Sequence, residues 1–357
     1  MAAALLAAIS FFPVCAEAVS AENAIVLDAA TGRVLYEKSA DERGLIASTT
    51  KIMTALVVCE QCNVLDRMRI PKEAVGIEGS SMYLKEGEVL TIQELLYGLM
   101  LHSGNDAAVA LAIYCGGTVE GFVELMNDKA HLIGLKDTHF ENPNGLDSPG
   151  HFSTARDMAI LTAYAMKNPI FSKTVSTKTV NVTNRSLRNH NKLLWLVDGV
   201  DGVKTGYTKA AGRILVSSAV RQGRRLIVVT MNDPNDWKDH TQLLNSGFEQ
   251  YSVRQVIKKG DCLGYAGIAG GELGEAPLIA ADDFSYSFRS DEEPQVLLQE
   301  FGVVYAPVVQ GQEAGYGYIC IDDTVVGKVP VVFGATVEQY KNEERTFWQK
   351  IFGGKQE

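Results

Sequence analysis

The sequence predicts a mixed α/β (α+β) protein with two domains, a larger one with a helical middle and a smaller β-rich one. Its 357 residues exceed the usual size of a single domain. Near residue 254 the pattern changes from helical spacing of apolar residues to short β-branched runs broken by Gly, Pro and Asp. An apolar fraction of 46% with 21% charged residues is typical of globular chains that bury a core.

The N-terminal residues predict an export signal. Residues 1–21 contain an apolar run that ends in small residues, and Ala16-Glu17-Ala18 fits the A-x-A pattern of a signal peptidase site. No Lys or Arg precedes this run, so a buried N-terminal helix is the alternative. No other segment reaches the roughly 18 consecutive apolar residues that span a bilayer. We therefore expect an exported protein that works outside the cytoplasm.

Periodicity sets the order of elements in the larger domain, residues 22–253. We expect a strand hairpin at 24–27 and 33–36, helices around 52–59, 95–100, 106–114, 119–133 and 154–166, strands at 175–182, 212–220 and 224–231, and a helix at 243–253. Ser153 is the expected N-cap of the helix at 154–166, and Gln222-Gly223 the turn between the last two strands. Short strands follow in a domain at 254–337, the last at 328–333, and helical spacing returns over 337–352.

Charge and cysteine content exclude several classes of function. The formal net charge is −10 with no cluster of Lys and Arg, so we expect no nucleic-acid partner. Five cysteines remain once Cys15 leaves with the signal, and an odd number cannot pair completely within one chain. Cys59 and Cys62 have C-x-x-C spacing, but no second C-x-x-C or His pair completes a zinc site. We expect small buried thiols without a metal or redox role.

A serine and a lysine one helical turn apart form the first candidate site. Ser48 and Lys51 directly precede an apolar-periodic helix, so their side chains are expected on the same face. A neutral lysine can take the proton of the serine, which requires burial or a nearby cation to lower the lysine pKa. The helix N-terminus also offers backbone N–H groups to a developing oxyanion. S-x-x-K alone is a weak signal, and a capping serine beside a solvated lysine is the alternative.

Two further short motifs follow in order. Ser103-Gly104-Asn105 is expected in a loop between two helices, where a hydroxyl and an amide can project into a cleft. Its alternative is a simple N-cap turn. Lys204-Thr205-Gly206 is expected on an edge-like strand, with Gly206 leaving room for a substrate backbone, and its alternative is a β-turn with a surface lysine. Each motif is weak alone, whereas the ordered set is specific.

The succession S-x-x-K, S-x-N and K-T-G resembles the active-site signature of penicillin-binding proteins and serine β-lactamases. Within that superfamily the chain is similar to the low-molecular-mass D-alanyl-D-alanine carboxypeptidases, the S11 peptidases. The resemblance covers roughly residues 24–337 and includes the flanking segments at 47–55, 103–108, 142–146, 153–157 and 201–208. It implies a β-lactamase/transpeptidase-like domain, an antiparallel sheet flanked by helices, followed by the β-rich domain and a C-terminal amphipathic helix.

The resemblance also implies a catalytic mechanism. Ser48 attacks the carbonyl between the two terminal D-alanines of a peptidoglycan stem peptide, and Lys51 is the general base. Ser103 relays the proton to the departing amine, assisted by Lys51 or Lys204, and the motif does not decide between the two lysines. Water then hydrolyses the acyl-enzyme, so neither a metal nor an organic cofactor is needed. β-Lactam antibiotics are implied as covalent inhibitors.

The same resemblance assigns substrate-binding roles. Asn105 hydrogen-bonds the amide backbone of the substrate. Lys204 and Thr205 receive its terminal carboxylate, a charge-assisted contact that selects a free C-terminus. The backbone N–H groups of Ser48 and Tyr207 form the oxyanion hole.

Arg188 and the histidines carry weaker signals. The segment around Arg188, residues 186–192, resembles the neighbourhood of the carboxylate pocket in the family, and a solvated arginine is the alternative. None of the six histidines has the spacing to an Asp and a Ser that a rival triad requires, so we expect structural or surface roles.

The C-terminal residues, 338–357, are expected to form a membrane-anchoring amphipathic helix. One helical face contains Tyr340, Phe347, Trp348, Ile351 and Phe352, with cationic residues interspersed. In the family that the chain resembles, such a tail lies in the membrane interface, a zone that suits aromatic and lysine side chains. The alternative is a helix docked on the β-rich domain. We expect the protein at the extracytoplasmic face of the cell membrane, near the cell wall.

Three other functions remain as alternatives. A D,D-endopeptidase that cuts peptide cross-links differs only in the groove beyond the scissile bond, which the sequence does not describe. A class A β-lactamase needs a placed Glu for rapid deacylation, and no motif supplies one. An inactive wall-binding module is disfavoured because all three motifs are intact.

Overall fold

The computed structural model describes residues 19–300 and 302–341. Two compact units divide the chain, at 1–251 and 252–357. Most of the expected signal peptide lies outside the described residues, but Val19 and Ala21 are buried in the first unit. The backbone N–H of Ser20 donates to Asp239 Oδ2 at 2.6 Å. The last residues of the expected signal peptide, 19–21, therefore pack in the first unit.

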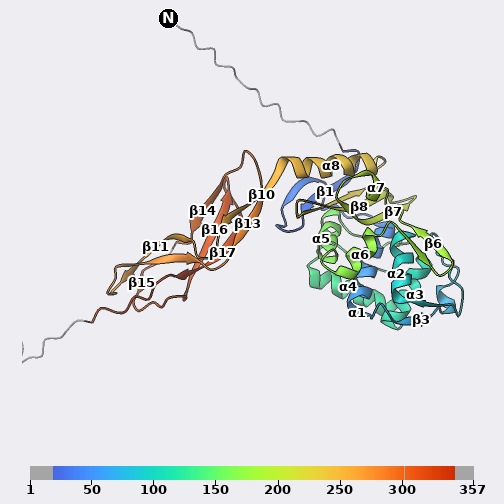
Figure 1. Ribbon diagram of the computed structural model, residues 1–357, viewed down its shortest axis with the longest axis horizontal. Coiled ribbons are helices and arrows are strands. Elements are labelled where there is room, and N and C mark those ends of the chain that lie inside the picture. Colours follow the sequence, from blue (N-terminus) through green and yellow to red (C-terminus); the bar gives the residue numbers. More distant parts are fainter. Residues whose placement is uncertain (1–18, 301, 342–357) are drawn as a thin grey trace, which may run out of the picture. The chain divides into compact units, whose positions relative to one another are not determined.

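The first unit is built on a five-stranded antiparallel sheet in the order β2-β1-β9-β8-β7 (Figure 1). Its strands are β1 (Asn23–Asp28), β2 (Val34–Lys38), β7 (Val200–Thr208), β8 (Gly212–Arg221) and β9 (Arg224–Met231). The expected hairpins β1–β2 and β8–β9 are confirmed. Gln222 and Gly223 turn between β8 and β9 with φ angles of 51° and 77°. β7, which contains the K-T-G motif, is an edge strand, as expected.

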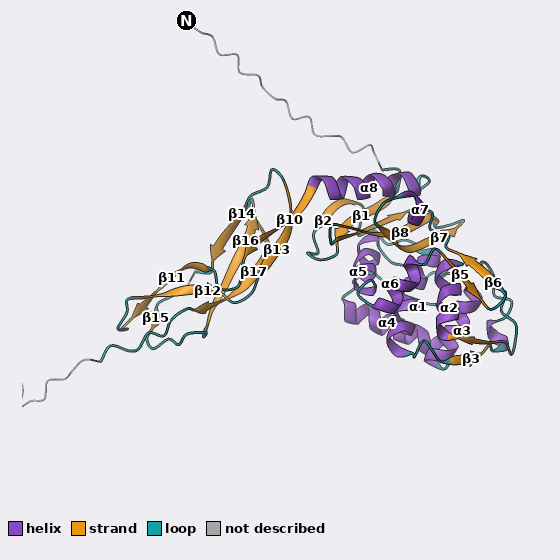
Figure 2. Cartoon of the chain, viewed as in Figure 1, coloured by secondary structure: helices purple, strands orange, loops and turns teal. Residues whose placement is uncertain are grey.

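Side-chain alternation along the strands sends apolar residues to both faces of this sheet. Ala24 and Val26 pack with α8 (Asp236–Gln250) on one face. Ile25 and Leu27 belong to the larger core on the other face, which the remaining long helices cover (Figure 2). The antiparallel sheet flanked by helices is thus confirmed.

The helices on the larger side include the five expected there, α1 (Lys51–Gln61), α2 (Ile92–Leu101), α3 (Asn105–Gly116), α4 (Val119–Ile133) and α5 (Ala155–Ala165), and three more that were not predicted, η1 (Ala47–Thr50), η2 (Lys72–Ala74) and α6 (Pro169–Ser176). The short helix α7 (Leu193–Leu196) lies beside α8 instead (Figure 1). Two small hairpins join the helices on the larger side, β3 (Arg67–Arg69) with β4 (Val89–Thr91) and β5 (Thr179–Val182) with β6 (Arg185–Arg188). Among the described residues no single helix could cross a membrane; α3 and α4 pass the length and composition test only as a pair, bent by 84°.

Three expected elements are corrected. The N-cap of α5 is Thr154, whose hydroxyl accepts from the N–H of Asp157, whereas Ser153 pairs with Gly44 in an isolated bridge. The strand expected at 175–182 begins only at Thr179, because Asn168 caps α6 and the helix continues through Ser176. The helix expected at 243–253 begins seven residues earlier, and the chain becomes a strand directly after it, at residue 251.

The second unit is β-rich, as expected. Its strands are β10 (Tyr251–Ile257), β11 (Cys262–Ala269), β12 (Glu275–Ala280), β13 (Phe284–Arg289), β14 (Pro294–Leu298), β15 (Val304–Tyr305), β16 (Glu313–Ile321) and β17 (Thr324–Phe333). Six form a sheet in the order β14-β16-β17-β12-β11-β15, and β10 pairs with β13.

The chain after β17 is not helical where the structure describes it. Val337 pairs with Val308 and Gln339 with Gly271 in isolated bridges, so the expected helix does not include 337–341. The backbone groups of these residues form bridges to other strands and loops, so they are not available for helical hydrogen bonds despite the helical spacing of the apolar side chains. The rest of the expected anchor, 342–357, lies outside the described residues.

Candidate active site

Ser48 lies on a tight turn that leads directly into α1. The preceding residue, Ala47, has a φ of 44°, a left-handed conformation that costs a non-glycine residue on the order of 1–2 kcal/mol. Its carbonyl accepts from Thr50 Oγ1 at 2.8 Å, and Thr50 Oγ1 lies 2.7 Å from His151 Nε2. The backbone N–H of Glu141 donates to Nδ1 of this histidine, so the ring proton resides on Nε2 and is donated to Thr50. A buried chain of hydrogen bonds therefore holds the turn.

Burial keeps that histidine neutral. His151 is 1% exposed, and desolvation lowers its pKa from 6.5 to about 4. His151 therefore has a structural role, as expected of the histidines, and through Thr50 it holds the Ala47 carbonyl next to Ser48.

Lys51 is fully buried, and its amine faces three oxygen atoms. Its Nζ lies 3.1 Å from Ser48 Oγ, 2.7 Å from Asn105 Oδ1 and 2.5 Å from the carbonyl oxygen of Asn144. Burial holds the Lys51 pKa well below its ordinary value, and the charge of Lys204 adds to this effect, while Asp106 opposes it. A neutral amine has two N–H donors and one lone pair. With the donors on Asn105 and Asn144, the lone pair faces the hydroxyl of Ser48.

The second motif is fixed by the start of α3. Ser103 is buried with a φ of 61°, and Asn105 is the first residue of the helix. Asn105 Nδ2 donates to the carbonyl of Glu78 at 2.6 Å, which orients Oδ1 toward Lys51. The next residue, Asp106, accepts from the backbone N–H groups of residues 82, 84 and 107 and from the Ser81 hydroxyl. This carboxylate thereby fixes the loop that closes the site.

The third motif lies along the edge strand β7. Lys204 is 1% exposed, donates to the carbonyl of Thr205 at 2.8 Å, and has its pKa lowered by burial to about 7. Tyr207 is exposed. A Cβ at Gly206 would lie 3.3 Å from both Ser48 N and the Ala47 Cβ. Glycine at this position thus lets β7 approach the nucleophile turn closely, and the expected room for a substrate backbone stays a prediction.

The three motifs meet at one cavity of about 330 Å³. Of the residues predicted from the motifs, Ser48, Ser103, Thr205, Gly206 and Tyr207 line it. Lys51, Asn105 and Lys204 are buried beneath this lining. The remaining lining residues are Ser80, His190, Arg213, Asp236 and Trp237.

Arg188 is not among the residues that line this cavity. It ends β6, and its guanidinium carbon lies 5.1 Å from the ring centroid of Trp195. Another arginine, Arg213, does line the cavity and is paired with Asp236 at 2.7 Å. The arginine at the cavity thus comes from β8 and not from the segment 186–192.

Several residues of the site were given no role from the sequence, although segment 142–146 was part of the resemblance. Asn144 contributes a backbone carbonyl, so its side-chain type carries no signal. The neighbouring Gly145 has a φ of 86°, and a Cβ there would lie 1.9 Å from the Ala47 carbonyl oxygen. Glycine at this position is the available signal, because it permits the close approach that brings Asn144 to Lys51.

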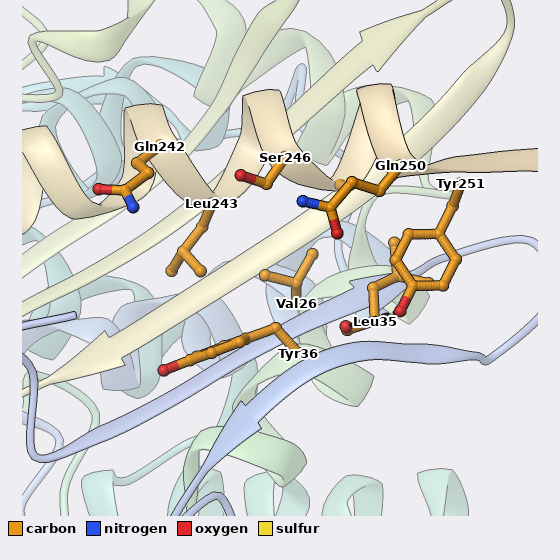
Figure 3. Close-up of a pocket in the computed structure, with 9 residues that line it drawn as sticks. Val26, Leu35, Tyr36, Gln242, Leu243, Ser246, Gln250 and Tyr251 are labelled. Atoms are coloured by element: carbon orange, nitrogen blue, oxygen red, sulfur yellow. Dashed lines mark hydrogen bonds between the residues drawn. The ribbon is translucent and has the colours of Figure 1, made fainter. Parts of the chain in front are cut away.

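A second, smaller cavity of about 60 Å³ lies between α8 and the β1–β2 hairpin. Figure 3 shows Leu243 and Ser246 above Val26 and Leu35, with Tyr36 below them and Tyr251 at the right. It contains no residue of the three motifs. Among the described residues no cluster of His, Cys, Asp and Glu is arranged to hold a metal ion.

Comparisons with known proteins agree with this architecture. Residues 12–235 match the family model "D-alanyl-D-alanine carboxypeptidase", peptidase S11, and residues 251–339 match "Penicillin-binding protein 5, C-terminal domain". The D-alanyl-D-alanine carboxypeptidase DacF of Bacillus subtilis is 34% identical over 349 residues, covering 93% of this chain and 89% of that protein.

Solved structures show the same similarity. Penicillin-binding protein 5 from Haemophilus influenzae superposes with a TM-score of 0.79 at 30% identity, covering 90% of this chain and 98% of that one. The Streptomyces K15 DD-transpeptidase gives a TM-score of 0.62 at 36% identity, covering 65% of this chain and 98% of that one. The chain belongs to the peptidase S11 family of D-alanyl-D-alanine carboxypeptidases.

Proposed function

We propose that this serine hydrolase removes the terminal D-alanine from peptidoglycan stem pentapeptides through an acyl-enzyme on Ser48. The observation that carries the proposal is the environment of Lys51. Its amine is buried, its pKa is depressed, and it lies 3.1 Å from Ser48 Oγ. A lysine in this state is a base, whereas an exposed lysine at neutral pH is a cation.

In the acylation step, Ser48 Oγ attacks the carbonyl carbon between the two D-alanines as its proton passes to Lys51 Nζ. The contacts of Nζ with Asn105 Oδ1 and the Asn144 carbonyl stabilise the ammonium ion that forms. The negative charge on the former carbonyl oxygen is received by the backbone N–H groups of Ser48 and Tyr207. The close packing of Gly206 against Ser48 N supports this assignment, since it brings β7 next to the turn.

Collapse of the tetrahedral intermediate requires a proton for the departing amine. We assign this relay to Ser103, which lines the cavity beside Ser48. Either Lys51 or Lys204 can resupply the Ser103 proton. With a pKa near 7, Lys204 exists in both protonation states near neutral pH. Lys51 becomes neutral again when it returns its proton through Ser103 or, if Lys204 supplies that proton, when it loses its own to solvent. Water then attacks the ester with Lys51 as the base, and the shortened peptide is released.

Substrate selection is assigned to Asn105, Thr205 and Lys204. The side-chain amide of Asn105 lies beside Lys51 Nζ at the floor of the site, and Thr205 lines the cavity. A terminal carboxylate bound at Thr205 favours the protonated form of Lys204, because an anion raises the pKa of a neighbouring amine. The same pocket accepts the carboxylate of a β-lactam, so these antibiotics acylate Ser48 in place of the substrate.

The experiment that tests the function compares two substrates. Full-length protein is incubated with a stem pentapeptide and with a cross-linked peptide dimer, and released D-alanine and cleaved dimer are quantified. We expect D-alanine release with little dimer cleavage, and loss of this activity in Ser48→Ala. Preferred cleavage of the dimer would instead identify an endopeptidase, and no turnover of either substrate would favour an inactive wall-binding module.

We also propose that the protein is exported and attached to the outer face of the membrane through the tail after residue 341. The proposal rests on the amino acids there, Phe347, Trp348, Ile351 and Phe352, which have helical spacing. Truncation after Lys341 is expected to abolish sedimentation with lipid vesicles and leave pentapeptide hydrolysis unchanged. Trp348→Ser and Phe352→Ser are milder variants, which should lose vesicle binding and keep the thermal stability of the wild-type chain. Failure of the full-length protein to sediment, or a loss of thermal stability in these variants, would favour a docked helix.

A further inference from the structure

Cys62 and Cys115 lie at the ends of two helices that pack together. Cys62 directly follows α1, and its backbone N–H still donates to the carbonyl of Val58 at 3.0 Å. Cys115 is in the last turn of α3, and α1 contacts α3. Their side chains are hydrogen-bonded to each other. The C-x-x-C spacing in the sequence suggests Cys59 as the partner of Cys62, but the fold brings Cys62 next to Cys115.

The three thiols differ in exposure. Cys59 is buried, whereas Cys62 and Cys115 are both partly exposed, which corrects the expectation of buried thiols for this pair. The hydrogen bond from Cys115 lowers the pKa of Cys62, and the same bond raises the pKa of Cys115. Burial raises the pKa of Cys59 to about 12. Cys62 is therefore the thiol that ionises first and is accessible to a reagent.

Short contacts already fix both ends of this pair. Tyr114, next to Cys115, donates its hydroxyl to Asp66 Oδ2 at 3.0 Å. Asp66 in turn accepts from Asn63 Nδ2 at 3.0 Å, and Asn63 directly follows Cys62. The segment after α1 is thereby tied to the end of α3 without a covalent bond. The two thiols therefore lie at a junction that other contacts already hold together.

We propose that Cys62 and Cys115 are a disulfide-forming site. The Cys62 thiolate attacks one sulfur of an incoming disulfide, RS–SR, whose S–S bond breaks and releases one RS⁻. The Cys115 thiol then loses its proton and attacks the Cys62 sulfur, which expels the second RS⁻. The protein thiols are oxidised, the incoming disulfide is reduced to two thiols, and the two protons pass to solvent or to the released thiolates.

The bond would stabilise the active site from a distance. α1 begins at Lys51 and ends beside Cys62, and α3 begins at Asn105 and ends just beyond Cys115. The disulfide thus links one end of a helix pair whose other end holds the contact between Lys51 Nζ and Asn105 Oδ1. Closing this loop of the chain also limits the unfolded state, which raises stability.

The test uses full-length protein treated with oxidised glutathione, then alkylated and digested without reduction. We expect a peptide pair joined through Cys62 and Cys115, with the loss of two hydrogens relative to the reduced peptides. The thermal midpoint should rise by several degrees on oxidation and return on reduction. Cys62→Ser should lose both effects, and the matched variant Cys59→Ser should keep both.

Two results would overturn the proposal. One is a peptide pair joined through Cys59 and Cys62 instead. The other is a stable glutathione adduct on Cys62 with Cys115 still free, because the second exchange step would then have failed. The mass measurement decides between these outcomes even if one of the variants folds poorly, since it is first made on the wild-type chain.

Discussion

Replacing Gly145 with Ala is expected to impair Ser48 without touching a catalytic side chain. The new Cβ would lie 1.9 Å from the Ala47 carbonyl oxygen, about 1 Å closer than side chains tolerate. The nucleophile turn, or the loop that carries the Asn144 carbonyl, must shift by that amount. A misplacement of about 1 Å typically costs on the order of 100-fold in rate. The left-handed φ of 86° adds about 1–2 kcal/mol of destabilisation.

Gly134→Ala is the matched control for this change. Gly134 has a φ of 85°, nearly the same as Gly145, but a Cβ there meets no atom within 4 Å. The control therefore includes the backbone strain and excludes the clash. Acylation by a fluorescent penicillin is measured by stopped-flow or gel, and stability by thermal unfolding. We expect both variants to lose stability and only Gly145→Ala to lose about two orders of magnitude in acylation rate. Equal acylation rates in the two variants would refute the proposed packing of the turn.

Three further changes test the electrostatics. Lys51→Ala should abolish acylation while circular dichroism remains native, and near-normal acylation would transfer the base role to Lys204. Asp106→Asn should move the acidic limb of the acylation rate to lower pH, because the Asp106 charge raises the Lys51 pKa; an unmoved limb would disprove the coupling. His240 is buried with a pKa lowered from 6.5 to about 3, so the unfolded chain binds the proton more tightly and stability falls as the pH drops below about 6.5. His240 alone should contribute about 2 kcal/mol to that loss at pH 5, so His240→Gln should lose about 2 kcal/mol less than the wild type between pH 6.5 and pH 5, as measured by urea unfolding; an equal loss in both proteins would disprove the role of His240.

Much of the fold was predictable because local signals and tertiary packing agree. β1 and β9 alternate between two buried faces; β1 was predicted as half of a hairpin with a turn at 28–32, and β9 from its β-branched residues. α6 was missed because Thr174 and Val175 favour strands by propensity. The start signal was present, since Asn168 caps the helix and Pro169 occupies its first turn. Burial of Phe171 and Val175 in the main core then outweighs the β propensity.

The candidate site divides in a similar way. Residues that act through their own functional groups at fixed spacing, such as Ser48, Lys51 and Asn105, were found from motifs. Contributions from distant segments were not, because no spacing rule connects them to the motifs. Only the folded chain brings the Asn144 carbonyl to Lys51 Nζ and the pair of Arg213 with Asp236 to the cavity.

The most direct test of the proposed mechanism is the site of acylation. Full-length protein is mixed with penicillin, quenched in acid, and analysed by intact-mass and peptide mass spectrometry. The proposed role of Ser48 predicts one covalent adduct per chain, located on the peptide that contains Ser48 and absent in Ser48→Ala. An adduct that persists in Ser48→Ala, or that maps to Ser103, would contradict it.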